Sequence, residues 1–202
     1  MARIESVCVY CGSASGADPL FAEEARRFGR ILAAEGVRLI YGGGGIGLMG
    51  EVASAVALAG GAVTGIIPRF LMSRERAFGH EAEMIVVEDM HARKRLMFER
   101  ADAFVALPGG IGTLEELVEQ LTWAQLGQHR KPILIANIAG FWDPLVSLVE
   151  HMRRAAFIRA ETPVDVLTAT TAEEILPRLR EAAAEVPERV LHAADGTLAD
   201  RM

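Results

Sequence analysis

The stretch that decides the fold is Pro108-Gly109-Gly110-Ile111-Gly112-Thr113-Leu114-Glu115-Glu116. The apolar run 103–107 before it is typical of a buried strand, and the apolar spacing after it predicts a helix over Leu114–Gly127. A glycine-rich turn at a helix N-terminus favours an anion, most often a phosphate, through its backbone N–H groups. Because two carboxylates end this turn, we predict chemistry on a phosphorylated substrate. The alternative is a plain βα turn whose glycines only relieve strain.

A second glycine cluster, Gly42–Gly50, follows the apolar run Val37–Tyr41 and precedes a helix of small residues, 51–59. It contains the pattern Gly45-x-Gly47-x-x-Gly50 of dinucleotide-binding proteins. The next predicted strand ends in Pro-Arg rather than in an acidic residue, which disfavours NAD but leaves NADP open. The simpler interpretation is two glycine turns on neighbouring strands, both at the carboxyl edge of one sheet.

Strand-like and helix-like segments alternate along most of the chain. The expected strands are 6–10, 37–41, 62–67, 83–87, 103–107, 131–136 and 164–167, and helices are expected to begin after Asp18, Gly50, Asp89, Thr113, Trp142 and Thr171. This alternation predicts an α/β fold, a Rossmann-like doubly wound domain with a mainly parallel sheet and helices on both faces. We expect one domain over residues 1–186 and a loose C-terminal tail over 187–202.

Composition narrows the function classes. The chain has 202 residues, 51% of them hydrophobic, and a net charge of −6. Without a basic run, signal pattern or long apolar run, it is expected to bind neither nucleic acid nor membrane and to be cytoplasmic. The five histidines show no ligand spacing, so no metal is expected. Cys8-x-x-Cys11 permits a redox role, but Cys8 lies inside the first predicted strand, where such motifs are not usual.

Two motifs together resemble one family. Pro108–Glu116 matches the pattern P-G-G-x-G-T-x-x-E, and Met90–Lys94 matches M-x-x-R-K. Cys11–Ser13, Tyr41–Gly44 and Leu121–Gly127 are also similar. These residues resemble the LONELY GUY (LOG) family of cytokinin riboside 5′-monophosphate phosphoribohydrolases, often labelled lysine decarboxylases. The resemblance implies a homodimer with active sites near the subunit interface. It also implies cofactor-free hydrolysis of a nucleoside 5′-monophosphate, such as a cytokinin riboside 5′-monophosphate or AMP, to free base and ribose 5-phosphate.

The resemblance also implies roles for individual residues. Glu116 and Arg93 are the expected catalytic pair, because cleavage of an N-glycoside develops positive charge that a carboxylate can stabilise. On spacing alone, Arg93 and Lys94 would fit an exposed helix surface equally well. Glu115 is expected to contact the ribose hydroxyls or to cap the helix. The expected substrate-binding residues are Glu75, Lys94, Gly109, Gly110, Ile111, Gly112, Thr113, Leu114, Glu115, Thr122, Ser13, Gly43, Gly44 and Gly45.

Two other functions compete with this hypothesis. A pyridoxal phosphate decarboxylase needs a Schiff-base lysine, and the chain has only Lys94 and Lys131. A non-catalytic nucleotide or cofactor carrier of the same fold, such as the molybdenum cofactor carriers, would not need Glu116 together with Arg93. Two helices are expected to pair across a dimer axis, because they carry more apolar residues than one sheet face needs: Leu96, Met97, Phe98, Leu117, Val118, Leu121, Trp123 and Leu126.

Overall fold

A computed structural model describes residues 4–72, 82–158 and 166–184. Its strands are β1 (Ser6–Tyr10), β2 (Arg38–Tyr41), β3 (Val63–Pro68), β4 (Glu83–Val87), β5 (Ala103–Ala106), β6 (Ile133–Ala136) and β7 (Leu167–Ala169). Its helices are α1 (Pro19–Ala34), α2 (Gly47–Leu58), α3 (Met90–Arg100), α4 (Ile111–Gln125), α5 (Asp143–Arg154) and α6 (Ala172–Ala184), with 3-10 turns η1 (Arg69–Leu71) and η2 (Ile138–Gly140). The predicted tail, 187–202, lies outside the described residues.

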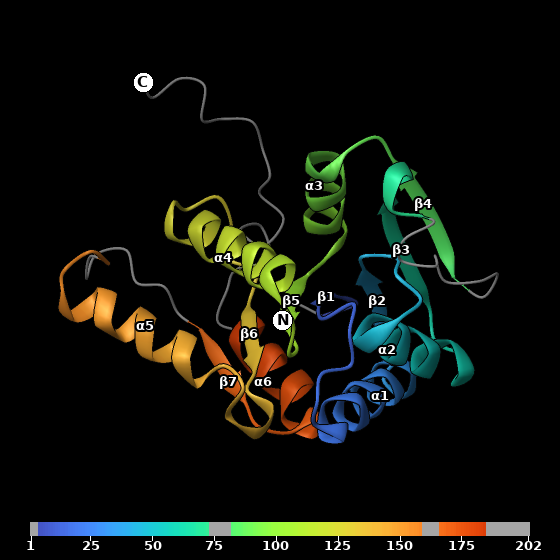
Figure 1. The fold of residues 1–202 in the computed structure, drawn as a ribbon, viewed down its shortest axis with the longest axis horizontal. Coiled ribbons are helices and arrows are strands. Elements are labelled where there is room, and N and C mark those ends of the chain that lie inside the picture. The colour runs from blue at the N-terminus through green and yellow to red at the C-terminus, as the bar shows by residue number, and fades with distance from the viewer. Residues whose placement is uncertain (1–3, 73–81, 159–165, 185–202) are drawn as a thin grey trace.

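All the strand pairs are parallel, in the order β4-β3-β2-β1-β5-β6-β7 (Figure 1). Helices α1, α2 and α6 cover one face of the sheet, and α3 and α4 cover the other. Side chains of β1 alternate between the two cores: Val7 and Val9 enter the first, and Cys8 and Tyr10 enter the second. The predicted doubly wound α/β architecture is therefore confirmed.

The strand order reverses beside β1. The chain runs outward from β1 through β2 and β3 to β4, then returns through α3 to place β5 on the other side of β1. The two central strands end level, since Val9 pairs with Val105 and Tyr10 with Ala106. Open α/β sheets bind ligands outside the carboxyl ends of the strands at such a reversal. The loops that follow β1 and β5 are therefore the place to look for a site.

Two predicted helix boundaries are wrong in the same direction. Helix α2 begins at Gly47 rather than after Gly50, and α4 begins at Ile111 rather than at Leu114. Both helices start inside their glycine clusters, because glycine is tolerated in a first turn whose N–H groups have no helical partner. By contrast, Asp18 and Asp89 cap α1 and α3 as predicted, accepting from Leu20 N at 2.9 Å and Ala92 N at 2.8 Å.

The last strand is also shifted from its predicted position. It was expected over 164–167, whereas β7 runs over Leu167–Ala169 and residues 164 and 165 lie outside the described part. Its register is set by pairing with β6, where Ile135 lies opposite Thr168. Such an edge strand is positioned by its neighbour more than by its own apolar pattern.

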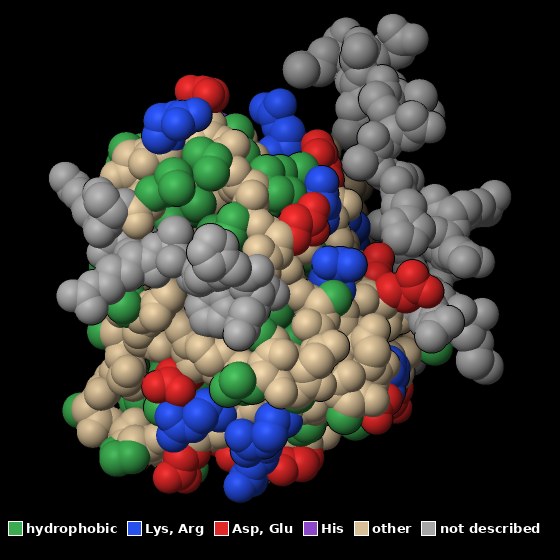
Figure 2. Space-filling model, turned by 90° about the vertical axis from the view of Figure 1, so that its right-hand side faces the viewer, with side chains coloured by type: hydrophobic (Ala, Val, Ile, Leu, Met, Phe, Trp, Pro, Cys, Tyr) green, Lys and Arg blue, Asp and Glu red, His purple; other side chains and the backbone are tan. Residues whose placement is uncertain are grey.

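The surface gives two further observations. On the face shown in Figure 2, basic and acidic side chains lie next to one another and no broad basic surface forms. In the described part of the chain, no helix is both long enough and apolar enough to cross a bilayer.

Candidate active site

Three loops meet at the carboxyl edge of β1, β2 and β5. Gly12, after β1, donates its N–H to the carbonyl oxygen of Pro108, after β5, at 3.1 Å. The carbonyl oxygen of Gly12 accepts from Met49 N, in the first turn of α2, at 3.2 Å. The loop after β1 therefore joins both predicted glycine turns into one surface.

Two glycines are required by how closely these loops approach. Gly47 has a φ of +59°, and a Cβ there would lie 2.3 Å from the carbonyl carbon of Ser13. A Cβ on Gly109 would lie 2.2 Å from the Oγ1 of Thr113, whose side chain is buried beneath the turn. Neither position can hold a side chain without moving its neighbour. These two glycines therefore allow the loops to approach each other closely, which fits both the anion-binding interpretation and a plain βα turn.

The two helices that start at this edge have no side-chain cap. The N-cap residues Ile46 of α2 and Gly110 of α4 make no side-chain hydrogen bond. Hydrogen bonding within α4 begins with Leu114 N donating to Gly110 O at 3.0 Å, so the N–H groups of residues 111–113 have no partner in the helical ladder. Gly110 and Gly112 are exposed, and a Cβ on either would meet nothing within 4 Å. This N-terminus is open to an anion.

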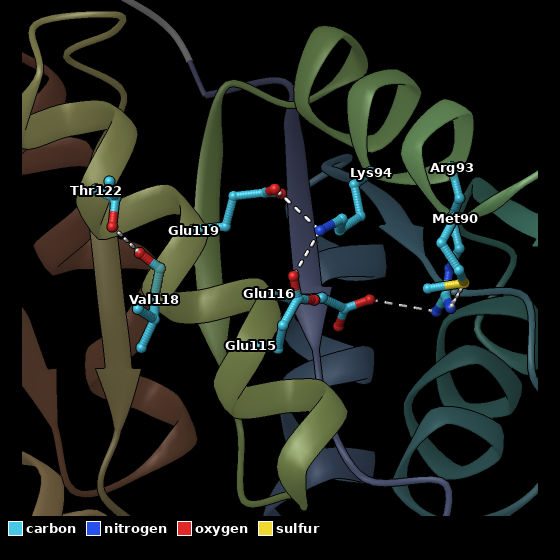
Figure 3. Close-up of polar contacts among 8 residues, drawn as sticks. All are labelled: Met90, Arg93, Lys94, Glu115, Glu116, Val118, Glu119 and Thr122. Carbon is cyan, nitrogen blue, oxygen red and sulfur yellow. Dashed lines mark hydrogen bonds and ion pairs between the residues drawn. The ribbon is translucent and has the colours of Figure 1, made fainter.

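Arg93 and Glu116 lie together next to this turn, each almost completely buried (Figure 3). Arg93 Nη2 is 3.4 Å from Glu116 Oε1, and its Nη1 lies 3.7 Å from the sulfur of Met90. A Cβ on Gly42 would lie 1.9 Å from Nη2, so the absence of a side chain at Gly42 makes room for the guanidinium. The exposed-surface alternative for Arg93 is therefore wrong.

One polar atom of this pair has no hydrogen-bond partner in the part of the chain that the structure describes. Arg93 Nε is buried and makes no hydrogen bond to any described residue. An unsatisfied buried N–H costs on the order of 1–3 kcal/mol, so a native structure that retains one usually has a reason. A donor left open beside a buried carboxylate fits a ligand that supplies the missing acceptor.

Lys94 and Glu115, both predicted to bind substrate, bind each other. Lys94 Nζ lies 2.5 Å from Glu115 Oε1 and 2.9 Å from Glu119 Oε1 (Figure 3). Burial lowers the pKa of Lys94, but the hydrogen bonds to Glu115 and Glu119 outweigh it and the pKa is raised overall. Lys94 is therefore a cation held between two carboxylates of α4. The prediction that Glu115 caps the helix is wrong, because Gly110 is the cap residue.

The structure does not bring every predicted residue to this cluster. Thr122 is exposed near the far end of α4, where its hydroxyl donates to the carbonyl oxygen of Val118 at 2.8 Å, away from Arg93 and Glu116 (Figure 3). Glu75 lies outside the described residues. The residues that do surround the edge are Ser13, Gly43, Gly44, Gly45, Gly109, Gly110, Ile111, Gly112, Thr113 and Leu114.

Sequence reasoning missed the second carboxylate bound by Lys94 and the floor of the site. Glu119 follows Glu115 by one helical turn, a spacing that was visible in the sequence. Tyr10 is the last residue of β1 and Cys11 follows it. Burial is the largest cause that raises the pKa of each of these groups, and the charge of Glu116 also raises it. They are near Glu116 because β5 pairs with β1, which no local pattern indicates.

The redox alternative for Cys8 and Cys11 has no structural support. Both are free, buried thiols, and they belong to different core clusters on the two faces of the sheet. Burial raises the pKa of each well above the ordinary thiol value, which disfavours the reactive thiolate.

Neither lysine is placed as a Schiff-base residue, and the described residues contain no metal cluster. Lys131 is buried at the opposite, amino edge of the sheet, where its Nζ donates to Phe98 O at 2.7 Å and lies 4.1 Å from the Phe98 ring centroid. Lys94 is held by its two carboxylates. Across residues 4–72, 82–158 and 166–184, no group of three His, Cys, Asp or Glu side chains could hold a metal ion.

A cavity of about 650 Å³ also lies at the amino edge, far from the glycine turns. Its arginines already have acidic partners: Arg180 pairs with Glu35 at 2.8 Å, and Arg38 and Arg100 pair with Glu83 at 3.7 and 3.5 Å. The carboxyl edge, with its unpartnered donor and open helix N-terminus, is therefore the better candidate site despite the size of this cavity.

The sequence comparisons agree on one family. The family model described as "Possible lysine decarboxylase" matches residues 49–179. The protein of Oryza sativa subsp. japonica named cytokinin riboside 5′-monophosphate phosphoribohydrolase LOG is 45% identical over 179 residues, which are 89% of this chain and 74% of that protein. The Arabidopsis thaliana protein of the same name, LOG7, is 43% identical over 186 residues, 92% of this chain and 86% of that protein.

Solved structures share the fold at lower identity. The molybdenum cofactor carrier protein from Chlamydomonas reinhardtii superposes with a TM-score of 0.66 at 19% identity, covering 91% of this chain and 100% of that one. The molybdenum cofactor binding protein from Rippkaea orientalis gives 0.65 at 22% identity, covering 90% and 98%. At these identities the likeness shows the fold alone. With relatives above 40% identity matched over most of both chains, this protein belongs to the LOG family.

Proposed function

We propose that this chain hydrolyses the N-glycosidic bond of nucleoside 5′-monophosphates, releasing the free base and ribose 5-phosphate. The observation that carries the proposal is the buried Arg93–Glu116 pair beside the open N-terminus of α4. A phosphate on that N-terminus would place a ribose within reach of the carboxylate. The names of the two relatives above, cytokinin riboside 5′-monophosphate phosphoribohydrolases, describe the same reaction.

Glu116 would stabilise the positive charge that develops on the ribose as the bond to the base breaks, and would activate the attacking water. Its burial strengthens this effect, because few water molecules screen a buried carboxylate. Arg93 holds Glu116 by an ion pair and retains an unused Nε donor for a substrate oxygen. In this proposal both residues touch the substrate.

The 5′-phosphate is assigned to the turn Gly109–Thr113, with Ser13 and Gly43–Gly45 on the facing loops. Its recognition by backbone N–H groups predicts that the phosphate is required. AMP and adenosine are therefore incubated separately with the protein, and released adenine is measured by chromatography. We expect adenine to be released from AMP, and from adenosine at a rate at least about 100-fold lower. The reason is that adenosine cannot form the charge-assisted hydrogen bonds between the phosphate and the backbone N–H groups. Equal rates would contradict the phosphate assignment.

The proposal specifies the base of the substrate less closely than its ribose 5-phosphate. Relatives are named for cytokinin riboside 5′-monophosphates, and AMP shares their adenine ring and ribose 5-phosphate. We propose activity on both. The kcat/KM values for AMP and for N6-isopentenyladenosine 5′-monophosphate decide which substrate is preferred. Equal kcat/KM values would mean that the site does not discriminate between substrates with and without the N6 substituent.

A non-catalytic carrier is the competing function, favoured only by the fold shared with molybdenum cofactor carriers. The same incubation discriminates the two, because a carrier would bind AMP and release no adenine. The buried Arg93–Glu116 pair supports hydrolysis, since binding alone does not require a carboxylate beside a phosphate.

We also propose a homodimer, with a corrected interface. Most of the apolar residues expected to pair two subunits are used inside this chain: Met97, Phe98, Leu117 and Leu121 are buried, and Leu96 and Trp123 pack against the same core. The large apolar side chains that stay exposed on α4 and at its C-cap are Ile111, Val118 and Leu126. A two-fold contact through them would use α4, the helix that carries Glu116, on the side turned away from Arg93 (Figure 3). Light scattering over a dilution series tests the dimer, and a monomer that is active at every concentration would refute it.

We also propose the cytosol as the compartment of this protein. Its two cysteines are free, buried thiols, and free thiols are usual in the reducing cytosol.

A further inference from the structure

Two consecutive residues of α3 reach α4 in different ways. Arg93 makes one contact with Glu116, at 3.4 Å, which is longer than a charge-assisted hydrogen bond of about 2.7–2.9 Å. Lys94 makes two contacts with the same helix, at 2.5 and 2.9 Å, and neither is longer than that range. The longer contact, Arg93–Glu116, is the one to which we assign the chemistry. The shorter contacts of Lys94 are better able to hold α3 against α4.

The two carboxylates that bind Lys94 flank Glu116. Glu115 precedes it in the chain, and Glu119 follows it by three residues, so all three lie on little more than one turn of α4. Like charges at this spacing repel one another on a helix. An ammonium between Glu115 and Glu119 cancels that repulsion and fixes the turn that carries Glu116 (Figure 3).

Lys94 is also poorly placed to bind substrate directly. Its side chain is 11% exposed, and two of its three donors are used by carboxylates. Its third donor remains, but the two carboxylates beside the ammonium would repel a substrate phosphate. The N–H groups of residues 111–113, which have no partner in the helical ladder, and Arg93 Nε, which has no hydrogen-bond partner among the described residues, are more available donors.

We propose that Lys94 is a positioning residue: by binding Glu115 and Glu119 of α4, it fixes the separation of α3 and α4 at which Arg93 meets Glu116. This inference rests on the proposed hydrolysis for its kinetic consequence, but its structural consequence can be measured without activity. It replaces the substrate-binding role that the sequence suggested for Lys94.

The test compares Lys94→Met, which keeps the aliphatic stem, with Lys94→Arg, which keeps the charge. Crystal structures of the wild type and of Lys94→Met give the distance between Arg93 and Glu116. We expect this distance to lengthen beyond 4 Å, or Arg93 to occupy a second rotamer. An unchanged Arg93–Glu116 geometry in Lys94→Met overturns the proposal, whether or not the protein hydrolyses AMP.

Kinetics on AMP provide the second readout. We expect kcat to fall about 10-fold in Lys94→Met with KM changed less than about 3-fold, and Lys94→Arg to recover most of kcat, because misplaced catalytic groups lower turnover rather than binding. A large rise in KM with kcat unchanged would make Lys94 a substrate ligand and overturn the proposal. A wild type that releases no base would refute the proposed function and leave the crystallographic result to decide this one.

The matched control is Arg180→Met. Arg180 joins α6 to α1 by an ion pair with Glu35 at 2.8 Å, on the other face of the sheet. Its loss removes an interhelical ion pair without touching α3 or α4, so kcat is expected to stay within about 2-fold of the wild type. A control that lost as much kcat as Lys94→Met would show that any broken ion pair has this effect, and would overturn the specific role of Lys94.

Discussion

The two faces of the sheet are covered by helix pairs that meet in different ways. On one face, α1 and α2 pack directly: a Cβ on Gly29 would lie 2.7 Å from Val52 O and 2.8 Å from the Cβ of Ala55. On the other face, α3 and α4 are joined by charged side chains, through Arg93–Glu116 and through Lys94 with its two carboxylates. Figure 1 shows α1 and α2 side by side and α3 standing apart from α4.

This difference follows from the strand order. Helices α1 and α2 connect β1, β2 and β3, which are neighbours, so they lie against each other. Helix α3 carries the chain back across β1 to β5, and α4 follows β5, so the two helices flank the reversal. Both faces carry an apolar core, and Phe98 of α3 also meets Trp123 of α4 through their rings, but only the second pair holds an almost completely buried ion pair, Arg93–Glu116. The candidate chemistry thus belongs to that face, and four substitutions test how the two faces differ.

The largest effect is expected from Glu116→Gln, which keeps the shape of the side chain and removes its charge. If Glu116 acts in the transition state, kcat on AMP should fall about 100-fold or more, with KM largely kept. The measurement is steady-state kinetics, with circular dichroism to show that the fold is retained. Near-normal kcat would move the catalytic role to another carboxylate, and Glu115→Gln is the next variant to test.

The next largest effect is expected on the stability of the protein, from a substitution between α1 and α2 on the other face of the sheet. Gly29→Ala places a methyl group against the backbone oxygen of Val52, and overpacking of this kind costs roughly 1–3 kcal/mol. We expect a lower free energy of unfolding in urea and an unchanged kcat. The control is Arg30→Ala, at the exposed neighbouring position of α1, which should change stability by less than about 0.5 kcal/mol. A more stable Gly29→Ala protein would contradict this prediction, because it would show that a methyl group fits between α1 and α2.

Gly42→Ala tests the site face at a position with no chemistry of its own. The added methyl would lie 1.9 Å from Arg93 Nη2, the far end of a flexible side chain, so Arg93 must move while the fold loses little. Because a displacement of about 1 Å can cost up to 100-fold in rate, we expect kcat to fall about 10-fold. The melting temperature should change by only a few degrees. Unaltered turnover would mean that the position of Arg93 is not critical.

The smallest effect is a predicted gain in stability on the site face. Gln120 of α4 is fully buried, and neither its Nε2 nor its Oε1 has a hydrogen-bond partner among the described residues. Replacing it by Met removes the unsatisfied amide at similar volume, which should raise the free energy of unfolding by about 1 kcal/mol. Urea denaturation measures the change. Destabilisation would indicate that a buried water or an undescribed residue satisfies the amide.

Local patterns in the sequence determined much of the architecture. Apolar periodicity predicted the alternating elements, and Asp18-Pro19 and Asp89 predicted two helix starts, because such capping depends on a few adjacent residues. A glycine-rich turn was predicted between a strand and a helix and is found there, although its residues 111–113 already form the first turn of α4. A glycine-rich turn at a helix N-terminus is local chemistry, so the candidate phosphate site could be located without a structure.

Only the tertiary structure decided which residues of α3 and α4 face each other. Arg93 could have been an exposed helix residue, and its burial against Gly42 and Glu116 depends on the return of the chain across β1. The ion pairs of Lys94 with Glu115 and Glu119 were not predicted, because partners from two helices become neighbours only when both pack on the sheet. The spacing of residues along one helix fixes their shared face, whereas the pairing of two helices depends on strand order, which no local pattern specifies.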